Sequence, residues 1–218
     1  KVVFDFTPPS VGEITVRDEN NEVIEGSNTN SGTVQVCGET EPGAQVQVSN
    51  TDADGESIGT CEGLAQDDGA YCVSCDLTEG QNQLYVTVID RARNSSAMNE
   101  DEESRGRSRL LNVDSAGPDV TFISPRPNAW VDPGEVDVRI QVVDNFNGVA
   151  SVTGGVGEAE GVAFPELQVE GESDIYGGTV SIPDEGDHFV LWVVATDNVG
   201  NESRTTVNLS KTGASVQL

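Results

Sequence analysis

The chain has 218 residues and carries 38 Asp and Glu side chains against 11 Lys and Arg, a formal net charge of −27 at pH 7. This balance excludes nucleic acid as a partner, because phosphate binding needs clustered Lys and Arg, and it disfavours anionic membrane surfaces. No stretch approaches the roughly 20 apolar residues that a membrane helix needs, so no membrane insertion is expected in this segment. The acidic excess favours a solvated surface protein or one that binds divalent cations.

The predicted elements are strands. Alternation of apolar and polar residues runs through residues 33–37, breaks at the turn 41–43 and resumes at 44–48. Such alternation, bounded by Gly, Asn, Asp and Pro, predicts an all-β fold of antiparallel sandwiches. Three later segments also place apolar side chains on one strand face: Leu84, Val86 and Val88; Val136, Val138, Ile140 and Val142; and Phe189, Leu191, Val193 and Ala195.

An approximate internal repeat divides the chain. Segments 84–95 and 189–203 are each a strand that runs into a turn of the pattern Asp-x-x-x-Asn, and residues 112–118 echo residues 4–9. Gly and Pro break strand pairing near Ala116. We therefore expect two domains: residues 1–115, with an insertion that carries the cysteines, and residues 116–218.

Residues 99–109 interrupt the first repeat. Their acidic half, 100–103, precedes a basic half with Arg105, Arg107 and Arg109. This pattern predicts a self-neutralising solvated loop, with a partner-docking loop as the alternative.

Ordered motifs lie at residues 5–9, 34–46, 68–71, 77–80 and 88–94 in the first half, and at 123–125, 143–149 and 195–201 in the second. Those of the first half resemble the bacterial Ig-like domains that repeat in large secreted adhesins and other cell-surface proteins, and those of the second half resemble a related bacterial Ig-like type. The resemblance covers nearly the whole chain. It implies two tandem immunoglobulin-like antiparallel β-sandwiches, an extracellular location, and calcium at the linkers, as in related tandem arrays.

Two features depart from that family. Arg91 and Arg93 fill turn positions where the family usually has small residues and Gly. The four cysteines are not a general feature of the family, so their interpretation rests on the oxidising compartment that a secreted, strand-rich segment implies.

The cysteines are Cys37, Cys61, Cys72 and Cys75, and their even number suggests two disulfides. Cys72 and Cys75 face opposite sides of one strand, because their numbers differ by three, and they are not expected to pair with each other. Cys37 could meet Cys75 across strands, which would leave Cys61 with Cys72. A zinc site is the alternative, since Cys72-x-x-Cys75 has ligand spacing.

Catalytic signals are weak. The single histidine, His188, follows Asp187 near a strand start without a nucleophile motif, and a solvent-facing position explains it. Residues 50–55 resemble the start of an EF-hand loop, but Cys61 stands where the bidentate Glu should be. A hairpin turn at Asp54-Gly55 is the better interpretation. We expect no enzyme activity.

A metal site is the stronger hypothesis. Asp114 lies in the linker before the second domain, Asp144 ends the expected B strand, and Asp197 ends the expected F strand. Because the chain entrance and these two loops share one end of an immunoglobulin sandwich, the three carboxylates should converge where the two domains meet, with Asn201 and Asn145 adding neutral oxygens. Calcium would stabilise such a cluster. The alternative is that these side chains only cap turns.

The first domain has a counterpart of this site in Asp5, Asp90 and Asn94. We expect it to be a weaker candidate for calcium, because Arg91 and Arg93 stand in its turn.

The main functional hypothesis is a non-catalytic spacer or adhesion segment of a larger bacterial surface or secreted protein. Its partners would be neighbouring Ig-like domains of the same chain and a host, bacterial or matrix surface ligand. One alternative is an accessory module of a secreted enzyme such as a glycan hydrolase. Another is a module that binds a carbohydrate or protein ligand through an exposed aromatic such as Trp130 or Tyr176, with Trp192 also expected to be exposed.

Overall fold

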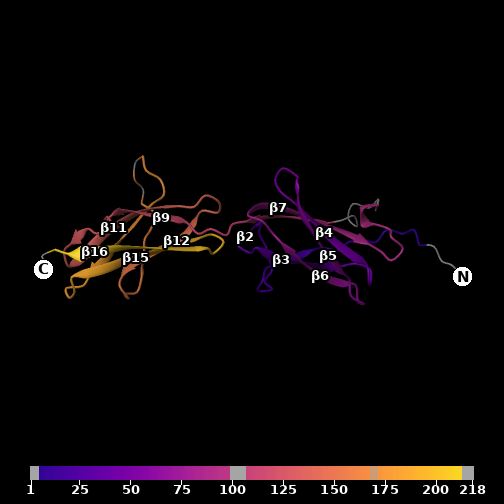
Figure 1. Ribbon diagram of the computed structural model, residues 1–218, viewed down its shortest axis with the longest axis horizontal. Helices are drawn as coiled ribbons and strands as arrows, with labels where there is room; N and C mark the ends of the chain where they lie inside the picture. Colours follow the sequence, from indigo (N-terminus) through magenta and orange to yellow (C-terminus); the bar gives the residue numbers. More distant parts are fainter. Residues whose placement is uncertain (1–4, 99–106, 168, 170, 213–218) are drawn as a thin grey trace. The chain divides into compact units, whose positions relative to one another are not determined.

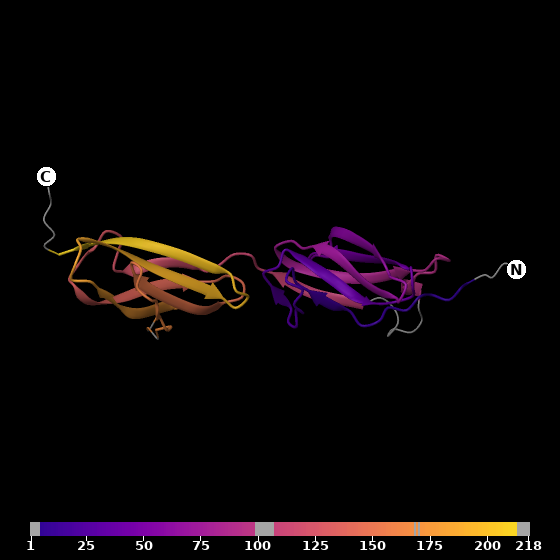
Figure 2. The same ribbon diagram turned by 90° about the horizontal axis from the view of Figure 1, so that it is seen from below.

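The computed structural model describes residues 5–98, 107–167, 169 and 171–212. The chain divides into two compact units, Lys1–Ser115 and Ala116–Leu218. Figures 1 and 2 show that each unit is built from strands arranged in two layers. In the described residues, one short 3-10 turn, η1 (Ser96–Met98), is the sole helical element.

The first unit has a sheet of three strands, in the order β1-β3-β6, and a sheet of five, in the order β2-β8-β7-β4-β5. Neighbouring strands are antiparallel, except that β2 and β8 pair in parallel. The strands are β1 (Thr15–Arg17), β2 (Asn28–Thr29), β3 (Thr33–Glu39), β4 (Gln45–Thr51), β5 (Ser57–Leu64), β6 (Ala70–Asp76), β7 (Gly80–Ile89) and β8 (Arg107–Val113).

The second unit repeats this plan. Its sheets have the orders β14-β11-β9 and β10-β16-β15-β12-β13, and only β10 and β16 pair in parallel among the described strands. The strands are β9 (Asp119–Ser124), β10 (Trp130–Val131), β11 (Gly134–Val143), β12 (Val149–Val156), β13 (Val162–Ala163), β14 (Ile175–Ile182), β15 (His188–Asp197) and β16 (Glu202–Lys211).

Each unit has its own core, formed by alternate residues of facing strands. Leu84, Val86 and Val88 are fully buried in the first core. Leu191 and Val193 are fully buried in the second, together with most of the other residues expected there. The strand alternation and the predicted fold class are therefore confirmed: both units are antiparallel sandwiches with parallel pairing only at one edge.

Two predicted turns have different outcomes. The hairpin at residues 52–56 is confirmed, since Asp52 Oδ1 accepts hydrogen bonds from the backbone of Asp54 and Glu56 at 3.0 and 2.9 Å. The prediction of a solvated loop at residues 99–109 is wrong at its C-terminal end, because β8 already begins at Arg107. Residues 99–106 lie outside the described part. Arg109 Nη2 donates to three backbone carbonyls of residues 24–26 at 2.7–3.1 Å, so this charge serves the fold.

All four cysteines form disulfides, which rules out the zinc alternative, but the predicted pairing is wrong. Cys37 bonds to Cys72, and Cys61 bonds to Cys75. The reason is the strand register: Cys37 of β3 lies directly opposite Cys72 of β6, whereas Cys75 lies opposite Val34. Cys75 faces the core and reaches Cys61 on β5, so the second disulfide joins the two sheets.

The buried Tyr71 on β6 should make the stability of the first unit depend on pH. It lies opposite Gly38 of β3, where an added Cβ would come within 2.6 Å of the Tyr71 hydroxyl oxygen. Burial raises the pKa of Tyr71 to about 12. In the unfolded chain the pKa is about 10. The first unit should therefore keep its stability below pH 10 and lose about 1.4 kcal/mol per pH unit between pH 10 and 12.

Urea denaturation at several pH values between 9 and 12 measures this loss, with Tyr71→Phe as the comparison. The hydroxyl has no hydrogen-bond partner in the described residues, so Phe should fold as well at pH 7. Identical pH profiles for the two proteins would show that other groups cause the alkaline loss.

Candidate metal centre

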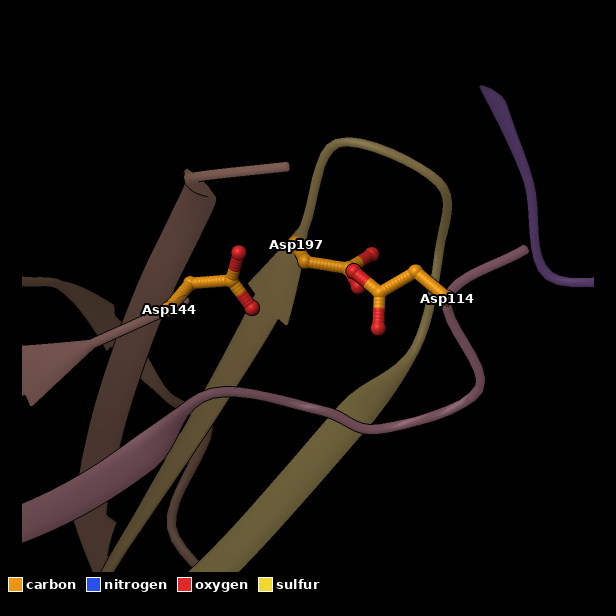
Figure 3. Close-up of side chains that lie close together, drawn as sticks. All are labelled: Asp114, Asp144 and Asp197. Atoms are coloured by element: carbon orange, nitrogen blue, oxygen red, sulfur yellow. The ribbon is translucent and has the colours of Figure 1, made fainter. Parts of the chain in front are cut away.

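Three carboxylates come together in the described structure: Asp114, Asp144 and Asp197. One oxygen of each lies within 4.8 Å of the others. Asp114 and Asp197 are only 3% and 2% exposed, and Asp144 is half-buried. Figure 3 shows the Asp144 and Asp114 carboxylates directed toward Asp197 from opposite sides.

Asp197 is held by the turn that it begins. Its Oδ1 accepts hydrogen bonds from the backbone of Val199 and Asn201 at 2.9 and 2.8 Å. Its Oδ2 accepts one from Asn201 Nδ2 at 2.8 Å. Asn201 was expected as a neutral ligand, and in the structure its amide nitrogen orients the Asp197 carboxylate. It also donates to the carbonyl of Ala116 at 3.4 Å.

Asp144 follows the end of β11 and is fixed by its own loop. Oδ1 accepts hydrogen bonds from the backbone of Phe146, Asn147 and Gly148 at 3.1, 2.7 and 2.6 Å. Asn198, which sequence reasoning missed, links this loop to the turn that Asp197 begins, because its Nδ2 donates to the carbonyl of Asn147 at 2.6 Å. The only sequence signal for it is its place directly after Asp197.

Asp114 follows the last residue of β8. Its backbone nitrogen donates to the carbonyl of Thr29 at 2.9 Å, which extends the β2–β8 pairing by one residue. Residues 115–118 then lead into β9, which begins at Asp119. The side chain is therefore carried by backbone that is still fixed by a sheet.

The donor set suits calcium. Ca²⁺ binds oxygen ligands at about 2.4 Å, so two oxygens on opposite sides of one ion are about 4.8 Å apart. The three carboxylates are already within that separation. Three like charges in a poorly hydrated place repel one another, and a divalent cation would remove that cost. Asp144 and Asp197 are also pre-oriented by backbone donors, so little ordering remains for an ion to impose.

The counterpart in the first unit is assembled differently. Asp5 and Asp90 line one pocket, together with Glu41 and Arg91. Asn94 Nδ2 bridges the Asp90 carboxylate, at 2.7 Å, and the carbonyl of Asp5, at 3.2 Å. In the described part of this unit, however, no three carboxylates come within 4.8 Å of one another.

The aromatic and histidine candidates are mostly accounted for by packing. Trp130 is 57% exposed, as expected. Trp192, expected to be exposed, is half-buried, because its ring packs on Gly155 and Gly161 with the Arg204 guanidinium 4.8 Å from the ring centre. Tyr176 is half-buried against the second core. His188 is exposed, as predicted, with Nδ1 3.3 Å from the Ser210 hydroxyl.

Two antiparallel sheets packed face to face, closed at one edge by a parallel pair, define an immunoglobulin-like sandwich in each unit. The model of the bacterial Ig domain family matches residues 23–100, within the first unit. The resemblance to the bacterial Ig-like domains seen in the sequence is therefore confirmed over this part of the chain.

Solved structures of tandem and multidomain proteins are similar at low identity. A tetra-tandem repeat from the extending region of a large adhesion protein has 19% identity and TM-score 0.35, over 93% of this chain and 50% of that one. A three-Ig segment of titin has 12% identity and TM-score 0.47, over 95% of this chain and 66% of that one. The endo-β-1,4-mannanase from Thermotoga petrophila has 18% identity and TM-score 0.36, over 46% of this chain and 21% of that one.

The chain thus covers a fifth to two thirds of these structures, and at such identities and scores the likenesses do not extend to function. A comparison with curated protein sequences found no match. Within the described residues, no helix has the length and apolar character to cross a membrane.

Proposed function

We propose that the chain is a non-catalytic spacer or adhesion segment of a larger bacterial surface or secreted protein, and that calcium bound by Asp114, Asp144 and Asp197 stabilises it. The bacterial Ig domain match supports the class of protein. The two disulfides support an oxidising, extracellular location. The convergence of the three carboxylates is the observation that carries the proposal.

The consequence for the chain follows from where Asp114 lies. A bound ion would hold this side chain in one place, and with it the start of residues 115–118. Those residues include Gly117 and Pro118, and no strand of the described structure contains them. Calcium would therefore restrict a segment that belongs to no strand, as a spacer needs.

Thermal unfolding with calcium and with a chelator tests this proposal. Both tryptophans, Trp130 and Trp192, lie in the second unit, so their fluorescence follows that unit alone. Calcium at 100 times its dissociation constant should stabilise the unit by about 2.7 kcal/mol. Sodium chloride at matched ionic strength corrects for simple screening of the acidic surface.

Variants locate the ion. Asp144→Asn should abolish most of the calcium-dependent shift, because it removes a charged ligand and keeps the side-chain shape. Asp137→Asn is the matched control: this exposed Asp on β11 accepts a hydrogen bond from the Thr179 hydroxyl at 3.0 Å and lies outside the cluster. The proposal is wrong if calcium causes no shift, or if both variants retain it.

A further inference from the structure

The two Asp-x-x-x-Asn turns have the same internal hydrogen bonds. In each, the Asn backbone nitrogen donates to the Asp Oδ1, at 2.7 Å for Asn94 and 2.8 Å for Asn201. The Asn side-chain nitrogen donates to the Asp Oδ2 at 2.7 and 2.8 Å. It also donates to a carbonyl of the segment that precedes the unit's first strand, Asp5 or Ala116. The first unit therefore contains a second copy of the frame that holds Asp197.

The copies differ at the residue after the Asp, which is Arg91 in the first unit and Asn198 in the second. Both lie against a glycine with positive φ: Gly43, with φ of 70°, in the loop between β3 and β4, and Gly148, with φ of 75°, in the loop between β11 and β12. A Cβ on Gly148 would be 3.5 Å from Asn198 Nδ2. A Cβ on Gly43 would be 3.0 Å from Arg91 Cζ and 3.1 Å from Nε, so the guanidinium packs against the backbone of this loop.

The charges of the first copy include this guanidinium. Asp5, Glu41 and Asp90 line one pocket, and Arg91 forms part of the same wall. The first copy thus combines three carboxylates with one fixed cation, because an Arg side chain is always charged. The cluster of Asp114, Asp144 and Asp197 has no Arg at the corresponding position, where Asn198 stands.

From this difference we infer that Arg91 is a built-in cation that lies beside the first unit's copy of the site and keeps a divalent ion out. The guanidinium offsets part of the carboxylate charge, and it covers the loop that an ion would have to approach. An ion placed there would also be repelled by it. The chain would therefore bind one calcium ion through these frames, and this number rests on the proposed calcium site of the second unit.

Isothermal titration of the whole chain with calcium chloride tests the inference. Arg91→Asn places at this position the residue that stands at 198, and it should add one bound ion per chain. Arg93→Asn is the matched control, because it makes the same charge change in the same turn at a residue that does not line the pocket. Asp90→Asn in the Arg91→Asn background should remove the added ion.

The outcomes separate this inference from the proposed function. If Arg91→Asn binds the same number of ions as the wild-type chain, the inference is overturned. It is also overturned if the wild-type chain already binds an ion that Asp90→Asn no longer binds. A wild-type chain that binds no ion overturns the proposed calcium site, while a gain in Arg91→Asn would still support the role of Arg91. If the shorter Asn prevents folding, Arg91→Gln, which keeps a long polar side chain without charge, replaces it in the same titration.

Discussion

Reduction of the two disulfides is expected to unfold the first unit while the second stays folded. The bonds close loops with sequence separations of 35 and 14 residues. Loop-closure entropy alone predicts that they stabilise the fold by about 4 and about 3 kcal/mol. A domain of this size has a total stability of about 5–15 kcal/mol. Losing both bonds therefore removes a large part of the first unit's free energy of unfolding, or all of it.

Calorimetry with and without reductant measures this effect, and the chain contains its own control. The second unit has no cysteine and contains both tryptophans, so its fluorescence transition should not move. The double variants Cys37→Ala/Cys72→Ala and Cys61→Ala/Cys75→Ala separate the two bonds. If neither pair lowers the stability of the first unit by more than about 1 kcal/mol, the entropic account is wrong for this protein.

The fold could be predicted from the sequence because its signals are local. Leu84, Val86 and Val88 alternate with polar residues, and this pattern alone defines a strand with one buried face. Residues 107–109 were misassigned because their charge pattern resembles a solvated loop. The buried Leu111 and Val113 show that the alternation of β8 was present just beyond it.

The disulfide pairing could not be predicted in this way, because it depends on the register between β3 and β6. That register places Cys37 opposite Cys72, and nothing within either strand specifies it. The half-burial of Trp192 has a similar cause: the ring packs on Gly155 and Gly161, which come from another part of the chain. Contacts of this kind arise only when distant segments meet.

The candidate site could be predicted from the sequence only in part. Asp114, Asp144 and Asp197 each lie at or just beyond the end of a strand, and immunoglobulin topology brings such ends together. Their convergence in the structure agrees with that reasoning, whereas the ion itself stays a proposal. Asn198 was missed because its role is to bond the loop of Asp144, a contact that depends on the packing of two turns.

The second large effect is expected at Phe164, which follows β13 and is 2% exposed. Its ring fills a slot between two glycines of different sheets. A Cβ on Gly154 would lie 2.5 Å from Phe164 Cε2 and Cζ, and one on Gly178 would clash with Cδ1. Phe164→Ala should therefore cost about 3–5 kcal/mol, because the glycines leave no side chain that could fill the cavity.

Urea denaturation followed by tryptophan fluorescence reports this loss, since both tryptophans are in the same unit as Phe164. Phe146→Ala is the matched control: Phe146 is 52% exposed, and its loss should change stability by about 0.5 kcal/mol or less. Gly178→Ala should overpack the slot and cost about 1–3 kcal/mol.

A double-mutant cycle distinguishes a filled slot from two unrelated defects. Combining Gly178→Ala with Phe164→Leu should cost less than the sum of the single changes, because the smaller side chain leaves room for the added methyl group. Strictly additive losses would mean that the ring and Gly178 do not compete for the same space. In that case the contact across β12 and β14 would not be what holds these two sheets together.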